Sequence, residues 1–235
     1  MTIYTVSITS DTVCPWCYVG YRQLQAAISK HLENHPGDGF SLRWHPFQLN
    51  PWVRTENAEQ ETKGNRNVLA EQPADAVLER LSAAGRSAGI NFCSNYRGRS
   101  TNTLDSHRLI EFARVKCVED ESRGACVPGL RSIQTRLVEE LFADYFECDR
   151  GITDHEILVA AAGRAGLYEK EVRTLLASHA LAEQVALKAE QARQNGVNGV
   201  PSFVINDIFE VQGAQEPAAF VALLERLKRR VKSKV

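Results

Sequence analysis

Strand-like alternation of apolar and polar residues is confined to the two ends of this 235-residue chain, and this feature most constrains its fold. Near the start, Tyr4, Val6 and Ile8 alternate with polar residues and predict a strand with one buried face. Helical spacing follows over 21–32, and a second alternation runs over 40–44. This opening of about fifty residues predicts a β-α-β unit, in which a helix joins two parallel strands.

The long middle of the chain has helical periodicity. Its strongest apolar stripe predicts a helix over 130–146. A plausible N-cap at Asp154 and a stop at Gly166 frame another helix, over 154–165. The polar residues 119–129 predict a loop. The remaining predicted helices are 76–88, 105–118, 169–178 and 181–194.

Strand character returns near the C-terminus, where 202–206 and 208–212 predict a hairpin around Asn206-Asp207. A last helix carries Phe220, Leu224 and Leu227 on one face. The order β-α-β, helical block, β-β-α requires the two ends of the chain to complete one sheet. We therefore predict an α/β fold with a split domain, 1–54 plus 196–235, and a helical insertion over 55–195.

Charge and hydropathy restrict the partners. A formal net charge of -1 argues against a dedicated nucleic-acid binder, and no apolar run is long enough to span a bilayer. The first residues read as a strand and not as a signal peptide, so we expect a cytoplasmic protein. The final Ser233-Lys234-Val235 is an imperfect relative of the peroxisomal Ser-Lys-Leu signal, and we attribute it to chance.

The Cys14-Pro15-Trp16-Cys17 tetrad lies at the junction of the first predicted strand and helix. Helix N-terminal N–H groups and the helix dipole would stabilise a thiolate at Cys14, which is the form that attacks disulfides. Cys17 lies one turn further on the same face, where it can resolve a mixed disulfide. Since Pro15 and Trp16 supply no cation, the dipole must provide most of the stabilisation.

A zinc half-site is the other common meaning of this cysteine spacing, and it needs two further ligands. No second CxxC occurs, the other cysteines are scattered singly, and we expect no HxxxH pair that would complete the site, so we predict no metal site in this chain. Cys117 and Cys126 bracket a polar segment and could form an auxiliary disulfide. In a reducing cytosol two free thiols are the safer expectation.

The sequence resembles the DsbA-like thioredoxin-fold oxidoreductases of the FrnE branch. The resemblance is carried by 10–20 (SDTVCPWCYVG) and 196–204 (GVNGVPSFV), with further similarity at 102–108 (NTLDSHR), 141–146 (LFADYF) and 213–215 (GAQ). It covers nearly the whole chain. It implies a thioredoxin-like fold interrupted by a large all-helical insertion, with Cys14 as nucleophile, Cys17 as resolving cysteine and Pro201 as a cis-proline facing them.

We expect a substrate-binding surface formed by Pro15, Trp16, Val200 and Pro201. The alternative for Trp16, which flanks the cysteines, is that its ring packs against the helical insertion. In the family, the cis geometry leaves the backbone of Val200 free to pair with an extended substrate or with glutathione. A trans-Pro that opens a strand is the alternative meaning of Pro201.

Three further residues, Asn102, Thr103 and His107, occupy positions that in the family pattern line the cleft. A purely local alternative exists, because Asn or Thr is also the residue that caps a helix N-terminus. Both interpretations stay open at the level of the sequence.

The sequence therefore favours a thiol–disulfide oxidoreductase acting on protein or small-molecule disulfides. We expect no tightly bound cofactor, glutathione or another thiol as co-substrate, and a monomer or homodimer. The alternative is a glutathione-dependent transferase or isomerase, similar to kappa-class glutathione transferases or 2-hydroxychromene-2-carboxylate isomerases, that tailors a secondary metabolite. Such an enzyme needs one activating group, so the complete Cys14/Cys17 pair favours redox exchange. A non-catalytic chaperone ranks last.

Overall fold

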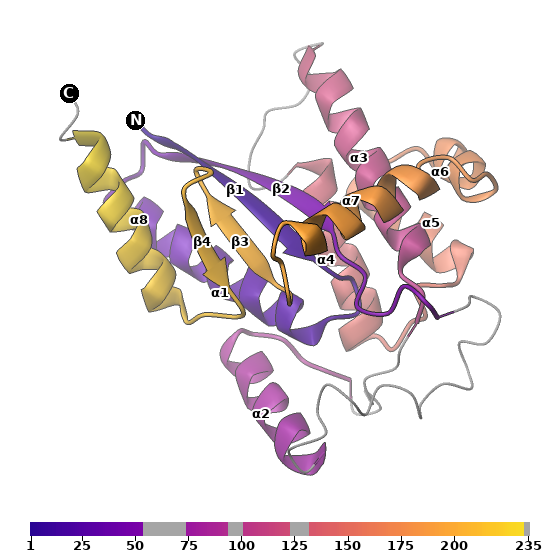
Figure 1. The fold of residues 1–235 in the computed structure, drawn as a ribbon, viewed down its shortest axis with the longest axis horizontal. Coiled ribbons are helices and arrows are strands. Elements are labelled where there is room, and N and C mark those ends of the chain that lie inside the picture. The colour runs from indigo at the N-terminus through magenta and orange to yellow at the C-terminus, as the bar shows by residue number, and fades with distance from the viewer. Residues whose placement is uncertain (54–73, 94–100, 123–131, 233–235) are drawn as a thin grey trace.

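The computed structural model describes residues 1–53, 74–93, 101–122 and 132–232. One mixed sheet forms its centre, with the strand order β2-β1-β3-β4 (Figure 1). β1 pairs in parallel with β2 and antiparallel with β3. The two ends of the chain thus complete one sheet, as predicted. The strands are β1 Ile3–Ser10, β2 Gly39–Pro46, β3 Ser202–Ile205 and β4 Phe209–Gln212.

Helices α1 (Pro15–Asn34) and α8 (Pro217–Lys232) pack together on one face of this sheet; in Figure 1 α1 passes behind the strands and α8 lies to their left. Ring contacts join the layers: Trp44 of β2 lies 5.0 Å from Tyr21 of α1, and Phe203 of β3 lies 5.2 Å from Phe220 of α8, between ring centroids. The alternating apolar residues of the strands face this layer, which gives the sheet its buried side.

The β3–β4 turn confirms the predicted hairpin. Asn206 and Asp207 have φ values of 53° and 55°, the left-handed pair that a two-residue type I′ turn requires. Asn206 also extends the pairing toward β1, because its N–H donates to the Thr5 carbonyl at 2.8 Å and its Oδ1 accepts from the Thr5 N–H at 2.9 Å. The turn residues therefore help to join the C-terminal hairpin to the first strand.

The helical block lies between β2 and β3 in sequence. In α5 (His155–Ala165) the side chain of the N-cap Asp154 accepts from the Glu156 N–H, and Gly166 ends the helix at a φ of 99°, as predicted. The block consists of α2 Ala74–Ser87, α3 Leu104–Ser122, α4 Ile133–Phe142, the π-helix η3 Ala143–Glu147, α5 His155–Ala165, α6 Glu169–Leu176 and α7 Ala182–Gln194.

Two predicted boundaries were wrong within the described residues. The predicted loop 119–129 begins too early, because α3 continues to Ser122; glutamate favours helix, so polarity did not mark the helix end. The predicted helix 130–146 instead starts at Ile133 after the N-cap Ser132, and its last turn is the π-helix, with the Cys148 N–H bonded to the Ala143 carbonyl at 3.0 Å.

The π-helix region joins the block to α1. The Tyr18 ring stacks on Phe142 and Phe146, at centroid distances of 5.0 and 5.9 Å, and its hydroxyl donates to Glu147 at 2.5 Å. Burial, together with this hydrogen bond to Glu147, raises the pKa of Tyr18, so the hydroxyl keeps its proton and donates. The contact fixes the first turns of α1, which carry the cysteines.

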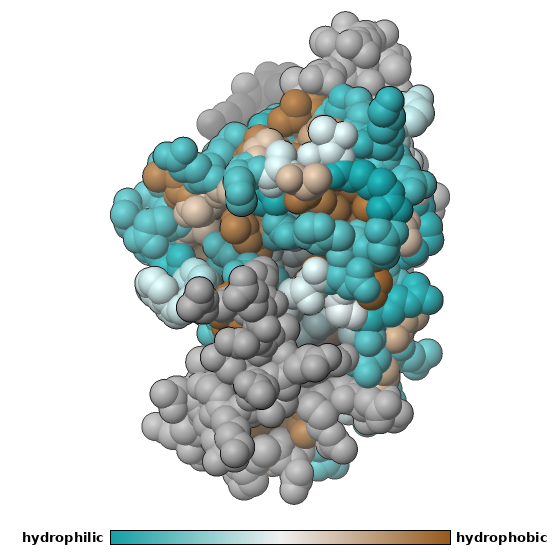
Figure 2. Space-filling view, turned by 90° about the vertical axis from the view of Figure 1, so that its right-hand side faces the viewer, coloured by the Kyte–Doolittle hydropathy of each residue, from teal (hydrophilic) through white to brown (hydrophobic). Residues whose placement is uncertain are grey.

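The outer face of the block, seen in Figure 2 from the right-hand side of Figure 1, is mostly hydrophilic with separate hydrophobic spots. Among the described helices, none combines the length and the hydropathy needed to cross a bilayer.

Candidate redox site

Cys14 is the N-cap residue of α1, and Pro15 occupies the first helical turn, where its missing N–H costs no hydrogen bond. The Cys14 N–H donates to the Asp11 carbonyl at 3.1 Å, and the Cys14 carbonyl accepts from the Cys17 N–H at 3.0 Å. The short loop after β1 and the first helical turn together position Cys14 at the positive end of the helix dipole.

The facing segment comes from the other end of the chain. Cys14 Sγ lies 3.5 Å from the Val200 carbonyl oxygen, and the Val200–Pro201 peptide bond is cis. Pro201 sits directly on α1 at Gly20: a Cβ there would lie 2.9 Å from Pro201 Cγ and 3.2 Å from the Phe203 ring. Glycine is therefore required at position 20 for the helix and the Pro201 loop to approach this closely.

The two cysteines are both thiols in this structure, and both are buried, Cys14 with 5% and Cys17 with 1% of its surface exposed. Burial raises the pKa of the Cys17 thiol well above its usual value, and the hydrogen bond and charge interaction with Cys14 raise it further. Hydrogen bonds from the Ser10 side chain and the Asp11 backbone act in the opposite direction. Cys17 therefore keeps its proton in the reduced pair.

The predicted binding residues next to the cysteines are partly accessible. Pro15, Trp16 and Val200 are half-buried, and Pro201 is buried. The Trp16 ring packs against the core and has the Arg80 guanidinium of α2 5.8 Å from its centroid. Their role in substrate binding stays a prediction.

The structure brings Asn102, Thr103 and His107 to the start of α3, behind the loop that precedes Cys14. Asn102 accepts from the Leu104 N–H at 2.8 Å, which is the local capping role, and donates to the Val53 carbonyl at 2.7 Å. Thr103 is only 2% exposed. A substrate-binding role for Asn102 and Thr103 stays a prediction.

His107 is 3% exposed and lies between two backbone segments. Its Nε2 is 2.9 Å from the Phe47 carbonyl oxygen and 3.3 Å from Asp11 Oδ1. Since a carbonyl can only accept, we assign the Nε2 proton to this bond. These contacts position the Asp11 loop; a contact of His107 with substrate stays a prediction.

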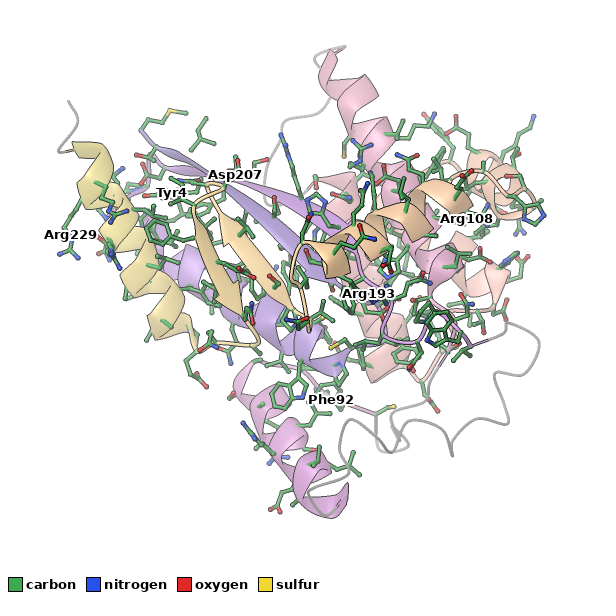
Figure 3. All side chains as sticks on the ribbon, viewed as in Figure 1. Tyr4, Phe92, Arg108, Arg193, Asp207 and Arg229 are labelled. Carbon is green, nitrogen blue, oxygen red and sulfur yellow. The ribbon has the colours of Figure 1, made fainter. Side chains whose placement is uncertain are left out.

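Sequence reasoning missed two side chains that hold the segment after β2. Asp11, fully buried, accepts from the Leu49 N–H at 2.7 Å, and Arg193 of α7 donates to the Gln48 carbonyl. The Arg193 guanidinium, labelled in Figure 3, also stacks over the Phe47 ring at 4.7 Å. Asp11 stood in the quoted motif without an assigned role, whereas no local pattern links α7 to residues 145 positions earlier.

A cavity of about 780 Å³ opens on the other face of the sheet and contains none of the predicted site residues. Among its lining residues are the cations Arg43, Arg114 and Lys188, together with His45. Burial and then the nearby Lys188 ammonium lower the pKa of His45. Since neither Cys14 nor Cys17 lines it, the cavity is separate from the cysteine pair.

Some predictions fall on residues that the structure does not describe. Cys117 is buried and free, but Cys126 lies outside the described residues, so their state as two thiols stays a prediction. The terminal Ser233-Lys234-Val235 also lies outside them.

A CxxC pair at the start of the first helix, facing a cis-Pro loop on a mixed four-stranded sheet, defines a thioredoxin-like domain, here interrupted by helices. The model of one family, the DSBA-like thioredoxin domain, matches residues 5–225. The chain belongs to this family, which confirms the predicted resemblance to DsbA-like proteins and the fold class; its place in the FrnE branch stays a prediction.

Solved structures agree with this assignment. A probable DsbA oxidoreductase from Streptomyces coelicolor is 27% identical, with a TM-score of 0.74 over 95% of this chain and 89% of that one. A 2-hydroxychromene-2-carboxylate isomerase (12%, TM-score 0.65, 98% and 99%) and the cytosolic disulfide reductase DsbM from Pseudomonas aeruginosa with GSH (18%, 0.57, 96% and 99%) share the fold. No curated protein matches this chain in sequence.

Proposed function

We propose that this protein is a thiol–disulfide oxidoreductase in which Cys14 is the nucleophile and Cys17 the resolving thiol. The observation that carries the proposal is the asymmetry of the pair: Cys14 caps the helix beside the Val200 carbonyl, while Cys17 is more deeply buried and has a raised pKa. The helix N-terminus stabilises negative charge on the first sulfur and not on the second.

In the reductive direction, the Cys14 thiolate attacks one sulfur of a substrate disulfide. A Cys14–substrate disulfide forms, and the first substrate thiol leaves. Cys17 then loses its proton and attacks the Cys14 sulfur, which releases the second substrate thiol and leaves a Cys14–Cys17 disulfide. The substrate gains two electrons and the pair loses two; two molecules of a thiol such as glutathione return the pair to the reduced state.

The contacts of Cys17 suit this sequence of steps. Two of the causes that raise its pKa, the hydrogen bond to Cys14 and the interaction with its charge, belong to the reduced pair. Once Cys14 is bound in a mixed disulfide, that charge is gone, while the bonds from Ser10 and Asp11 remain. The pKa of Cys17 is then expected to fall at the step at which its thiolate is needed.

The substrate class that we propose is a protein or small-molecule disulfide, held by the half-buried surface of Pro15 and Trp16 and by the backbone of Val200. Glutathione is the proposed co-substrate, supported by the likeness in fold to the GSH-bound disulfide reductase DsbM. Because DsbM is described as cytosolic, we propose the same compartment here.

The test is insulin reduction with glutathione as the thiol, using Cys14→Ser, Cys17→Ser and the exposed Cys148→Ser as the matched control. We expect Cys14→Ser to lose at least about 10³-fold in rate, because a hydroxyl is a far weaker nucleophile than a thiolate. Cys17→Ser should accumulate a glutathione adduct at Cys14, and Cys148→Ser should match the wild type. Full activity of Cys14→Ser would contradict the proposal.

Two further measurements settle its finer points. Glutathione-dependent turnover of a non-disulfide substrate by Cys17→Ser would instead indicate the transferase or isomerase alternative. The reduction potential of the pair sets the direction: a value of about -270 mV suits a reductant and about -120 mV an oxidant.

A further inference from the structure

A second group of chemistry-bearing side chains lies at the other end of α1. His31 and His35 are one turn apart at the end of this helix, and Glu225 reaches them from α8. One ligand atom from each of the three lies within 4.8 Å of the others. Glu225 Oε1 is 2.8 Å from His35 Nε2 and 3.5 Å from His31 Nδ1.

The tautomer of His31 follows from its other ring nitrogen. Nε2 lies 3.1 Å from Asp38 Oδ2. Asp38 also accepts from the Lys228 ammonium at 2.5 Å through Oδ1 and at 2.7 Å through Oδ2, an ion pair in which the group is a carboxylate. A carboxylate only accepts, which assigns the His31 proton to Nε2 and leaves the Nδ1 lone pair directed at Glu225 and His35.

That lone pair has no hydrogen-bond partner although His31 is fully buried. Among the described residues, two buried side-chain polar atoms lack a partner, His31 Nδ1 and the Tyr4 hydroxyl, and both lie at this end of the molecule. The Tyr4 ring, labelled in Figure 3, is 5.3 Å from the His31 ring. Buried polar atoms are nearly always paired, so an unpaired His31 Nδ1 close to two other ligand atoms indicates a missing ligand.

The chemistry of the three atoms matches a metal site. Imidazole nitrogens and a carboxylate oxygen are common zinc ligands, and a metal-bound histidine commonly donates its second N–H to a carboxylate, as His31 does to Asp38. Zinc bonds of about 2.0–2.1 Å place tetrahedral ligand atoms roughly 3.4 Å apart. The distances of 2.8 and 3.5 Å to Glu225 bracket that separation, and the two histidine nitrogens, within 4.8 Å of each other, can reach it by side-chain rotation.

We propose that His31 Nδ1, His35 Nε2 and Glu225 Oε1 bind a Zn²⁺ ion that links α1 to α8. The side chains of His35 and Glu225 are 23% and 36% exposed, which gives a water molecule access to the fourth position. At a rise of 1.5 Å per residue, the 14 residues from Cys17 to His31 place this site roughly 21 Å from the redox pair. The metal is therefore structural and takes no part in thiol exchange.

The sequence contains part of the signal for this metal site. His31-x-x-x-His35 is an HxxxH metal-ligand spacing on a helix, so the expectation that the chain has no such pair was wrong. The third ligand lies 190 residues away from His35, beyond the reach of any local motif.

The test is calorimetric titration of Zn²⁺ into the full-length Cys14→Ser/Cys17→Ser protein, which removes the active-site thiols as competing ligands. We expect one saturable site whose affinity falls at least tenfold in His35→Ala and in Glu225→Ala. The matched control is His155→Ala, because His155 pairs with a single carboxylate, Asp105, on the surface; it should bind as tightly as the parent. Co²⁺ in the site should show no thiolate charge-transfer band.

Absence of saturable binding, or equal affinity in His35→Ala, Glu225→Ala and His155→Ala, would overturn the proposal. Because His31 is buried and its substitution risks misfolding, the two half-exposed ligands carry the test. The titration contains no redox pair, so its outcome is independent of the proposed thiol exchange.

Discussion

Helix α1 carries the redox pair at its N-terminal end and a buried group of charged side chains at its C-terminal end. At the first end the sulfurs contact neutral groups, such as the Val200 carbonyl next to Cys14, and the contact between Asp11 and His107 lies one layer behind. At the C-terminal end ionisable side chains contact one another directly, because Asp38 accepts from both Lys228 and His31.

This difference in contacts follows from the function that each end of α1 has. A charge placed against the sulfurs would bias the pair toward the thiolate or the disulfide, whereas packing against Pro201 and backbone hydrogen bonds position it without that bias. The far end has no such restriction, so ion pairs can join α1, the turn before β2 and α8 there. Changes at the far end should therefore act on stability, and changes at the redox end on exchange.

The largest expected effect is at the far end. Asp38→Ala leaves the Lys228 ammonium and the His31 N–H without their acceptor, and removing one partner of a buried ion pair costs about 3 kcal/mol or more in the free energy of unfolding. Urea unfolding at pH 7 measures this. A loss below about 1 kcal/mol in the free energy of unfolding would mean that these buried charges stabilise the protein no more than an exposed ion pair does.

The same carboxylate predicts a pH dependence. The pKa of Asp38 is about 2 in the folded protein, below its ordinary value of 3.8. A lowered folded-state pKa contributes stability at pH values above the ordinary value, and this is lost as the pH falls from about 4 to about 2, to the extent of about 2 kcal/mol. Wild-type unfolding curves over this range should show the loss, and Asp38→Ala should lack it.

At the redox end, the two thiols should differ in reactivity. With the reduced protein near pH 8, iodoacetamide should modify Cys14 at least about 100-fold faster than Cys17, because burial and Cys14 itself hold the pKa of Cys17 high. Peptide mass spectrometry follows both sites. Equal rates would remove the asymmetry on which the assignment of nucleophile and resolving thiol depends.

A smaller effect is expected from Gly20→Ala. The added methyl meets Pro201 and Phe203, and overpacking of this kind costs about 1–3 kcal/mol while displacing the loop that faces Cys14. Both the unfolding free energy and the insulin-reduction rate should fall. Gly163→Ala, in α5 with open space around it, is the matched control and should be neutral or stabilising by up to about 1 kcal/mol.

The smallest effect is expected at the exposed pair Lys30–Glu33, which lies on the same helix near the buried charges. Both side chains are more than 60% exposed, so solvent and salt screen the attraction. Lys30→Ala should leave the unfolding midpoint unchanged in urea. A clear shift of the unfolding midpoint would show that surface charge, and not burial, determines how ion pairs at the C-terminal end of α1 stabilise the protein.

Local patterns predicted much of the fold. The alternation in β1, the helical spacing of α1 and the Asn206-Asp207 turn depend on residues a few positions apart, and each was found where predicted. The end of α3 was missed because polar residues that favour helix were interpreted as a loop, and the π-helix because its i→i+5 hydrogen bonds have no local sequence signal.

The candidate site divides in the same way. Cys14, Pro15 and Cys17 could be identified because a redox pair and the helix that stabilises it are adjacent in sequence. The contact of Arg193 with Gln48 could not, and neither could the close approach of Pro201 to Gly20, because each joins segments more than 140 residues apart.

The sequence by itself determined that strands lie at the two ends of the chain, that helices fill its middle, and that a dithiol pair begins the first helix. Only the tertiary structure decided how Val200 and Pro201 pack against that pair and the helix, how strongly burial raises the pKa of Cys17, and that His31, His35 and Glu225 converge at the far end. The physical reason is range: periodicity and capping act within a few residues, whereas burial, desolvation and ligand geometry depend on atoms that folding brings together.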